Sequence, residues 1–199
     1  MEQFINIISE LSPIIKSNNF TNIINLCEKL FPIKLGEGTT RIVYQLDDNN
    51  IIKIAKNNHG LQQNEYEYLA YQKFNQFNVL RKIYYMDLNK NYLIGENINT
   101  INIKQFNNLF NINYKEFIDN FAYLYHFKLN PKSICNNSFN PNQDNINLIY
   151  SKFNNLIELF KVFKPLQLRE ILDIDNIGID KNNNLTIIDY GWIPSNLVK

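Results

Sequence analysis

The sequence is poor in the residues from which disulfide scaffolds and zinc sites are built. It contains two cysteines, Cys27 and Cys135, far apart and without C-x-x-C spacing, and two isolated histidines, His59 and His126. Disulfide-stabilised folds use a denser set of cysteines, and a zinc site needs cysteines or histidines at ligand spacing. We therefore expect each cysteine to be a buried free thiol, and the sequence gives no support to a zinc site.

The sequence also lacks an excess of charge of one sign and a long apolar run. Its formal net charge is +1, and charged residues make up 20% of it. Neither value indicates binding to nucleic acid or to an anionic membrane. No apolar run approaches the roughly 20 residues that span a bilayer, and the first residues form no basic, signal-like segment. We expect a cytoplasmic protein with neither of these partners.

Glycine and alanine are scarce, whereas Asn, Ile, Lys and Tyr are used heavily. These four residues have A/T-rich codons, so base composition explains the bias. The asparagines are scattered among regularly spaced apolar residues, which argues against a low-complexity tract. With 199 residues, 45% of them hydrophobic, the chain is long enough for one domain or for two small lobes that share a cleft.

The spacing of apolar residues changes twice along the chain. Residues 1–32 have helical spacing and predict an N-terminal helical cap. Residues 33–97 predict a β-rich lobe with one helix, and residues 98–199 a reduced, mainly helical lobe that ends in a hairpin. The expected helices cover 62–74, 114–127 and 146–163, and the expected strands include 51–55, 82–86, 92–96, 171–179 and 185–188. The order predicts an α+β fold of two lobes in one compact unit.

Two glycines mark the first turn of the β-rich segment. Gly36 and Gly38 lie between two expected strands, and Val43 follows on the second of them. Such a turn lets the backbone close over phosphate oxygens without Cβ collisions, although an ordinary hairpin turn gives the same pattern. A third glycine of a phosphate-covering loop would fall at the position of Arg41.

Lys53 stands in the middle of an apolar strand, between Ile52 and Ile54. A buried lysine is costly unless its ammonium meets an anion, whereas on an edge strand it would face solvent. Glu67 on the following helix is a candidate partner, and Glu65 is its rival on a different helix face. The pattern favours a buried Lys53–Glu67 pair, which could also be purely structural.

The last hairpin carries an amide and a carboxylate that a short turn brings together. Asn176 lies in its first segment, 171–179, and Asp189 follows its second strand in the tripeptide Asp-Tyr-Gly. Amide and carboxylate oxygens suit Mg²⁺ that bridges phosphates. A surface hairpin with solvated acids is the alternative.

Together these motifs resemble the protein-kinase signature, and most closely that of the small kinase-like proteins of phage genomes. The resemblance implies that ATP is bound through Gly36, Gly38 and Val43, with Lys53 on its α- and β-phosphates and Glu67 paired to Lys53. It also implies that Asn176 and Asp189 hold Mg²⁺, and that residues 94–97, Glu96 included, form the hinge beside the adenine.

Two departures from that signature concern catalysis. The position of the catalytic aspartate, five residues before Asn176, is Ile171, which cannot deprotonate an acceptor hydroxyl. In an extended loop, the side chain of Asp173 would face the same way as that of Ile171. Asp173 or Glu170 could therefore substitute for the missing aspartate. In addition, only eight residues follow Gly191, so we expect neither an activation segment nor a substrate-docking helical subdomain.

Three functions remain compatible with the sequence. The first is a pseudokinase that binds ATP and Mg²⁺ and acts through a protein partner, as a phage accessory protein in the host cytoplasm or associated with the virion. The second is a minimal phosphotransferase for a protein or a small molecule, which uses Asp173 or Glu170 as its acid. The third is a viral structural or accessory protein that does not bind nucleotide. The presence of Lys53, Glu67, Asn176 and Asp189 argues against the third.

Overall fold

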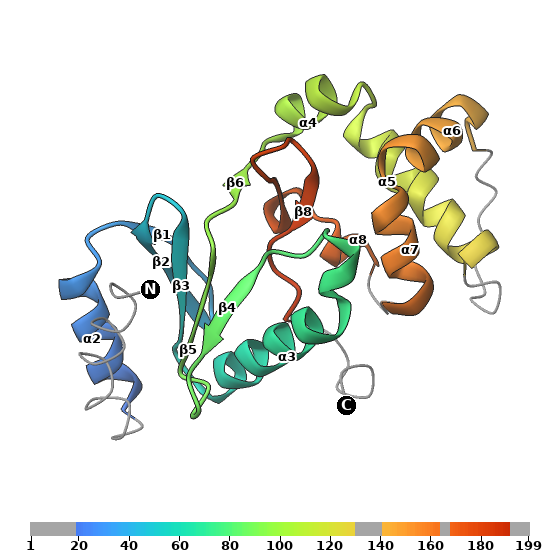
Figure 1. The fold of residues 1–199 in the computed structure, drawn as a ribbon. Coiled ribbons are helices and arrows are strands. Elements are labelled where there is room, and N and C mark those ends of the chain that lie inside the picture. Colours follow the sequence, from blue (N-terminus) through green and yellow to red (C-terminus); the bar gives the residue numbers. More distant parts are fainter. Residues whose placement is uncertain (1–18, 130–140, 164–167, 192–199) are drawn as a thin grey trace. The chain divides into compact units, whose positions relative to one another are not determined.

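A computed structural model of the chain describes residues 19–129, 141–163 and 168–191. The fold is α+β and divides into two units (Figure 1). The first comprises Met1–Leu69 and Lys82–Asn97, and the second Ala70–Arg81 and Ile98–Lys199. The long helix α3 (Asn58–Phe74) contributes residues to both.

The first unit contains a five-stranded antiparallel sheet in the order β1-β2-β3-β5-β4. Its strands are β1 (Lys34–Glu37), β2 (Arg41–Asp47), β3 (Asn50–Ala55), β4 (Ile83–Met86) and β5 (Tyr92–Glu96). In β3, a run rich in isoleucine, five consecutive residues are buried, as expected for a strand that is covered on both faces. The central position of β3 fixes the environment of Lys53.

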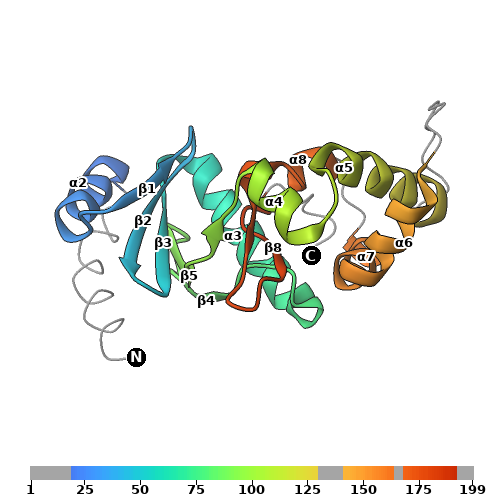
Figure 2. The same ribbon diagram turned by 90° about the horizontal axis from the view of Figure 1, so that it is seen from above.

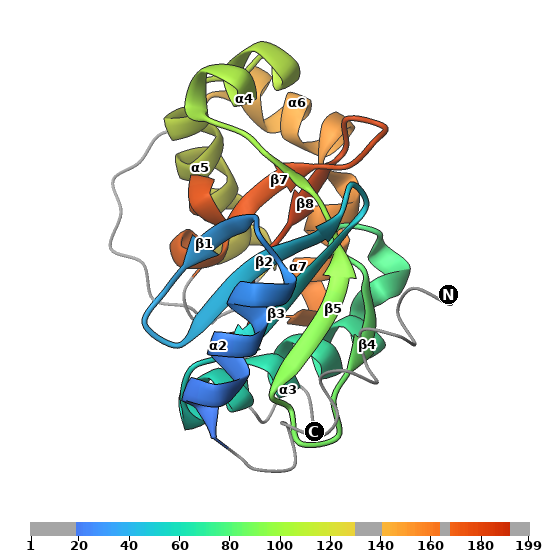
Figure 3. The same ribbon diagram turned by 90° about the vertical axis from the view of Figure 1, so that its left-hand side faces the viewer.

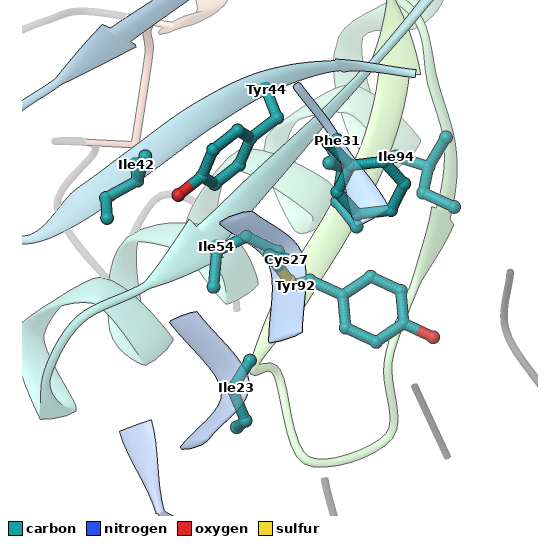
Figure 4. Close-up of a cluster of buried hydrophobic side chains, with 9 residues drawn as sticks. Ile23, Cys27, Phe31, Ile42, Tyr44, Ile54, Tyr92 and Ile94 are labelled. Atoms are coloured by element: carbon teal, nitrogen blue, oxygen red, sulfur yellow. The ribbon is translucent and has the colours of Figure 1, made fainter. Parts of the chain in front are cut away.

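Helix α2 (Phe20–Leu30) packs against one face of this sheet (Figure 3). Asn19 caps the helix, its side chain accepting a hydrogen bond from the Asn22 amide at 3.2 Å. Figure 4 shows the resulting core, in which Ile23, Cys27 and Phe31 meet Ile42, Tyr44, Ile54, Tyr92 and Ile94. Because residues alternate along a strand, Lys53 lies on the opposite face from Ile52 and Ile54.

Cys27 is a buried free thiol, as predicted. Burial, with a smaller contribution from the charge of Glu28, raises the pKa of the Cys27 thiol to about 12. A thiol that keeps its proton is a poor nucleophile and a poor metal ligand, so Cys27 is a packing residue. Cys135 lies outside the described residues.

The second unit combines a small antiparallel sheet with helices (Figures 1 and 2). The sheet has the order β6-β7-β8, formed by Asn99–Thr100, Ile177–Ile179 and Leu185–Ile187. The α-helices are α4 (Ile103–Phe110), α5 (Tyr114–Tyr123), α6 (Gln143–Lys152), α7 (Asn154–Phe163) and α8 (Leu168–Ile171). Shorter or irregular turns are η1 (Asn75–Phe77), the π-helix η2 (Leu124–Leu129) and η3 (Ile174–Asn176).

Phenylalanine rings form the core of the helical part. Phe153 contacts the rings of Phe106, Phe110 and Phe117 at centroid distances of 4.8 to 6.3 Å. Phe121 meets Phe160 edge to face at 5.4 Å. These pairs join α4 and α5 to the α6–α7 segment, so these phenylalanines pack inside the unit.

Three predicted elements differ from the structure. The predicted helix 146–163 is two helices, because Phe153 leaves the helical conformation (φ −121°, ψ 29°) between α6 and α7 and buries its ring. The predicted helix 114–127 ends as α5 at Tyr123 and continues as the π-helix η2. The predicted strand 171–179 is wrong over most of its length, since α8 and η3 precede a strand of only three residues.

Candidate functional site

The centre of the first unit is a buried ion pair between Lys53 and Glu67. The Lys53 Nζ atom donates to Glu67 Oε1 at 2.6 Å, and the two side chains are 3% and 0% exposed. Lys53 lies on β3 between β2 and β5, directly opposite Val43 and Leu93, so the solvent-facing edge-strand alternative is wrong. Glu65, the rival partner, pairs instead with Lys90 at 2.8 Å.

Arg41 is a member of this cluster that the sequence analysis missed. Its side chain is buried, and its Nη1 atom donates to Glu67 Oε2 at 2.6 Å. The same nitrogen lies 3.4 Å from Asn64 Oδ1. One buried carboxylate therefore serves two buried cations, one on each oxygen. The only sequence signal was that Arg41 stands where the third glycine of the loop would fall.

The glycine turn between β1 and β2 is held by polar contacts. The Gly38 amide donates to the Arg41 carbonyl at 2.9 Å, and Lys56 Nζ donates to the Gly38 carbonyl at 3.1 Å and to Glu37. Hydrogen bonds from Lys56 and Lys34 lower the pKa of the Glu37 carboxyl to about 2. Gly36 and Gly38 are both exposed, and neither has a positive φ angle.

No close contact inside this unit requires glycine at either position. A Cβ atom on Gly36 would meet nothing within 4 Å, and one on Gly38 would lie 3.9 Å from the nearest atom. Val43, the third predicted residue of this loop, pairs with Lys53 across the ladder, so the two side chains share one face of the sheet. The face of the sheet that carries Lys53 thus also carries Val43, on the strand that follows the glycine turn.

Residues 94–97 form the end of β5 and the first residue after it. The Glu96 amide donates to the Lys82 carbonyl at 2.9 Å, and the Asn97 amide donates to the Asn49 carbonyl at 2.7 Å. The Glu96 carboxylate accepts a longer contact of 3.4 Å from Lys82 Nζ. Backbone hydrogen bonds therefore tie this segment to Lys82 and Asn49, and its role as a hinge stays a prediction.

In the second unit, Asn176 and Asp189 lie at the same end of the β7–β8 hairpin. Ile177 is directly opposite Ile187, and the Ile188 amide donates to the Asn176 carbonyl at 2.8 Å. The Asn176 Nδ2 atom donates to the Glu170 carbonyl at 2.7 Å, which fixes the amide orientation and leaves Oδ1 as the atom suited to a cation. The backbone of the hairpin thus places Asn176 and Asp189 at one end of it, and their joint role as cation ligands stays a prediction.

Ile171, which stands where the resemblance leads one to expect a catalytic aspartate, is buried. Ile171 ends α8 and is 7% exposed, so its side chain belongs to the core. The extended loop predicted for Asp173 is wrong, because this residue caps η3 and its Oδ1 atom accepts the Asp175 amide at 3.0 Å. Asp173 and Glu170 are exposed.

Tyr114 anchors the same segment and was not predicted. Its hydroxyl donates to the Leu172 carbonyl, between Ile171 and Asp173. Burial and the charges of Asp173 and Asp175 raise the pKa of Tyr114 to about 12. Tyr114 therefore keeps its proton near neutral pH and remains a hydrogen-bond donor to the loop.

The tyrosine of Asp-Tyr-Gly is a core residue. Tyr190 is 1% exposed, and its hydroxyl donates to the Arg81 carbonyl at 2.7 Å. The segment around Arg81 also pairs with β8, since the Arg81 amide donates to the Ile187 carbonyl at 2.9 Å. These bonds fix the backbone on which Asp189 is placed.

Comparisons with known proteins found similarity only among solved structures. No protein-family model and no curated protein sequence matches the chain. The ternary complex of streptomycin, ATP and APH(2")-IIa is 16% identical with a TM-score of 0.42, and the match covers 87% of this chain and 71% of that one. The ADP-bound aminoglycoside phosphotransferase APH(2'')-Ib is 14% identical with a TM-score of 0.40, over 80% of this chain and 64% of that one.

SAICAR synthase from Saccharomyces cerevisiae, in complex with SAICAR, is also similar. It is 7% identical with a TM-score of 0.38, over 78% of this chain and 72% of that one. At these identities and TM-scores the three similarities carry no functional argument.

Two further observations limit the chemistry of the described residues. None of their helices combines the length and the hydropathy that a bilayer crossing needs. No three of their His, Cys, Asp and Glu side chains gather into a group that could hold a metal ion. A cation at Asn176 and Asp189 would therefore need further oxygens, such as those of a phosphate ligand or of water.

Proposed function

We propose that this chain is a protein-kinase-like protein that binds ATP with Mg²⁺. The observation that carries the proposal is the buried Lys53–Glu67 pair on β3 and α3. A lysine is a costly choice for a covered central strand, and an apolar residue would pack there without a charge. An ammonium held by a carboxylate beside a glycine turn is suited to bind the phosphates of a nucleotide.

The exposed glycines support the same proposal. Glycine inside a strand lowers stability, so an unconstrained glycine calls for another reason. Gly36 and Gly38 have room for a side chain within the first unit, which removes internal packing as that reason. Close approach of a ligand to the backbone is a function that glycine serves, and phosphate oxygens are such ligands.

Asn176 and Asp189, both in the second unit, are the residues that would hold Mg²⁺. The two residues lie at the same end of the β7–β8 hairpin, and their side chains carry an amide oxygen and a carboxylate. Mg²⁺ prefers oxygen ligands and is usually bound through one or two carboxylates together with the phosphates of a nucleotide. When bound, it would neutralise phosphate charge, and the residues of this chain would hold it in place.

We further propose a pseudokinase, which binds nucleotide without transferring phosphate and acts through a protein partner. A general base must lie within hydrogen-bond reach of the hydroxyl that it deprotonates. Ile171 cannot do so, and the Asp173 carboxylate is used to cap η3. An active phosphotransferase that uses Asp173 or Glu170 is the second candidate, favoured by the exposure of both carboxylates.

Millimolar Mg·ATP is expected to raise the melting temperature of the protein by several degrees. Ligand at a hundred times its Kd stabilises the fold by about 2.7 kcal/mol, and each kcal/mol is worth roughly 2–4 °C at this size. Lys53→Ala and Asp189→Asn should lose the shift, and Lys53→Ala should still fold because Glu67 keeps its bond to Arg41. Lys161→Ala, an exposed lysine paired with Glu158, is the control that should keep it. No shift in the parent protein would refute nucleotide binding.

The same proteins distinguish the pseudokinase from the enzyme. With radiolabelled ATP, a protein substrate panel and a panel of hydroxylated small molecules, we expect no phosphate transfer above the Lys53→Ala background. The reason is that the acid position is the buried Ile171. Transfer that disappears in Asp173→Asn or Glu170→Gln, while the Mg·ATP shift persists, would establish the phosphotransferase instead.

A further inference from the structure

Arg41 occupies the junction between the glycine turn and the buried ion pair. It is the first residue of β2, and its carbonyl accepts the Gly38 amide at 2.9 Å, so its backbone closes the turn. Arg41 precedes Val43 by two residues in β2, so the two side chains lie on the same face of the sheet. Val43 is paired with Lys53, so this is also the face of Lys53. The residue thus belongs both to the turn and to the cluster around Glu67.

The two cations of this cluster use different oxygens of Glu67. Lys53 Nζ is 2.6 Å from Oε1, and Arg41 Nη1 is 2.6 Å from Oε2. Suppose that Arg41 did not contact Glu67. A phosphate that attracts the Lys53 ammonium would then weaken the Lys53–Glu67 pair with no second cation to hold the Glu67 carboxylate. Because Arg41 holds the second oxygen, Glu67 stays paired while the Lys53 ammonium is shared between carboxylate and phosphate.

We propose that Arg41 is a positioning residue for phosphate binding, an inference that rests on the proposed function. It fixes Glu67 from the second oxygen, and Glu67 in turn directs Lys53 to the phosphates of Mg·ATP. This role makes the effect of Arg41 depend on the phosphates of the ligand. If Arg41 only joined β2 to α3, its substitution would weaken the binding of a ligand without phosphates as much as that of Mg·ATP.

The test compares the Kd values of Mg·ATP and of adenosine, measured by calorimetry or by displacement of a fluorescent ATP analogue. Arg41→Gln is expected to raise the Kd of Mg·ATP about tenfold or more, since hydrogen bonds to charged groups are worth about 1.5–3 kcal/mol. The Kd of adenosine should change less than about twofold, because it has no phosphate. Lys161→Gln removes one positive charge from an exposed pair in the other unit and should change neither value.

Arg41→Lys keeps a cation opposite Glu67 but loses the planar, multi-donor guanidinium. It should raise the Kd of Mg·ATP less than Arg41→Gln does, about threefold, again without an effect on adenosine. This variant carries the test if Arg41→Gln does not fold, which the melting temperature of each protein reports. An unchanged ratio of the adenosine and Mg·ATP Kd values in the folded variants would overturn the positioning role.

The outcomes separate this inference from the proposed function. If the parent protein does not bind Mg·ATP, both are wrong. If the parent binds it and Lys53→Ala does not, while Arg41→Gln binds as the parent does, nucleotide binding stands and the role of Arg41 is refuted. If Arg41→Gln weakens Mg·ATP and adenosine by the same factor, Arg41 is a structural residue only.

Discussion

Glu67→Gln is expected to destabilise the protein by about 3–5 kcal/mol, the cost of breaking a buried ion pair from one side. In the parent, each oxygen of the fully buried Glu67 carboxylate accepts from one cation, Lys53 or Arg41. A glutamine can offer one oxygen to one of them, but its NH₂ group then points at the other. The neutral amide cannot balance the charges of the two buried cations, so the electrostatic attraction of both ion pairs is lost.

Glu65→Gln is the matched control on the same helix. Glu65 also pairs with a lysine, Lys90, but its side chain is 32% exposed and that of Lys90 is 37% exposed. Such partly exposed pairs contribute about 0–1 kcal/mol. Urea unfolding at neutral pH, followed by circular dichroism, measures both variants. Similar midpoints for Glu67→Gln and Glu65→Gln would show that the buried cluster does not depend on the Glu67 charge.

Lys53→Met tests the same cluster from the other side. It leaves Glu67 paired with Arg41, so the cluster becomes one cation and one anion. Removing one partner of a buried pair is costly when it leaves the other charge unpaired, but Glu67 would keep Arg41 here, so we expect Lys53→Met to lose less stability than Glu67→Gln in the same urea unfolding. A smaller loss of stability in Lys53→Met would indicate that Lys53 serves function and not stability. A loss as large as that of Glu67→Gln would contradict this interpretation.

Lys53 and Glu67 could be predicted from the sequence because both patterns are local. An isolated lysine within an isoleucine-rich run indicates a buried charge, and the helix that follows offers few carboxylates. The rule that residues two apart lie on different helix faces separated Glu67 from Glu65, and the structure gives these two residues different partners. The strands within residues 33–97 were also predicted from their apolar runs and polar turns, whereas their order in the sheet was not.

Arg41 could not be predicted in the same way. An arginine at the start of a strand, after a glycine turn, is typical of a surface position, and its partner Glu67 is 26 residues away. Only the packing of α3 against β2 brings the two together. The available signal was that Arg41 stands where the resemblance leads one to expect a glycine. That signal does not identify the partner of Arg41, which only the tertiary structure shows.

The prediction for residues 171–179 failed for a physical reason of another kind. Alternating apolar and acidic residues have the period of a strand, and Leu172 to Asp175 alternate in this way. The side chain of Asp173, however, offers its backbone a local alternative by accepting the Asp175 amide. Aspartate often competes with regular structure in this way, so capping overrode the period.

Two glycines of the first unit are expected to respond in opposite ways to alanine. Gly60→Ala should destabilise the protein by about 1–3 kcal/mol, the usual cost of overpacking. Its Cβ atom would lie 2.3 Å from the Thr40 carbonyl oxygen and 3.0 Å from Ala55. Both contacts involve backbone atoms, which cannot rotate away. At an uncrowded helical position the same change would instead stabilise the protein, by up to about 1 kcal/mol.

Gly60 is crowded because the first turn of α3 lies against Thr40, at the end of the glycine turn. The Thr40 carbonyl already accepts the Lys56 amide at 2.8 Å, and the Thr40 hydroxyl donates to Gln63. Displacing α3 here would also move Glu67, which lies two turns further along the helix. Gly60→Ala should therefore lower both the melting temperature and the affinity for Mg·ATP.

Gly36→Ala is the matched glycine variant with the opposite expectation. Its Cβ atom would meet nothing within 4 Å, so the melting temperature should stay the same or rise slightly. If the turn covers phosphates, the added methyl group should nevertheless raise the Kd of Mg·ATP several-fold, because it enters the space that a ligand would occupy. Calorimetric unfolding and binding measurements on both variants decide the matter. Unchanged affinity in Gly36→Ala would remove the glycine turn from the phosphate site and leave Lys53 as the principal support for it.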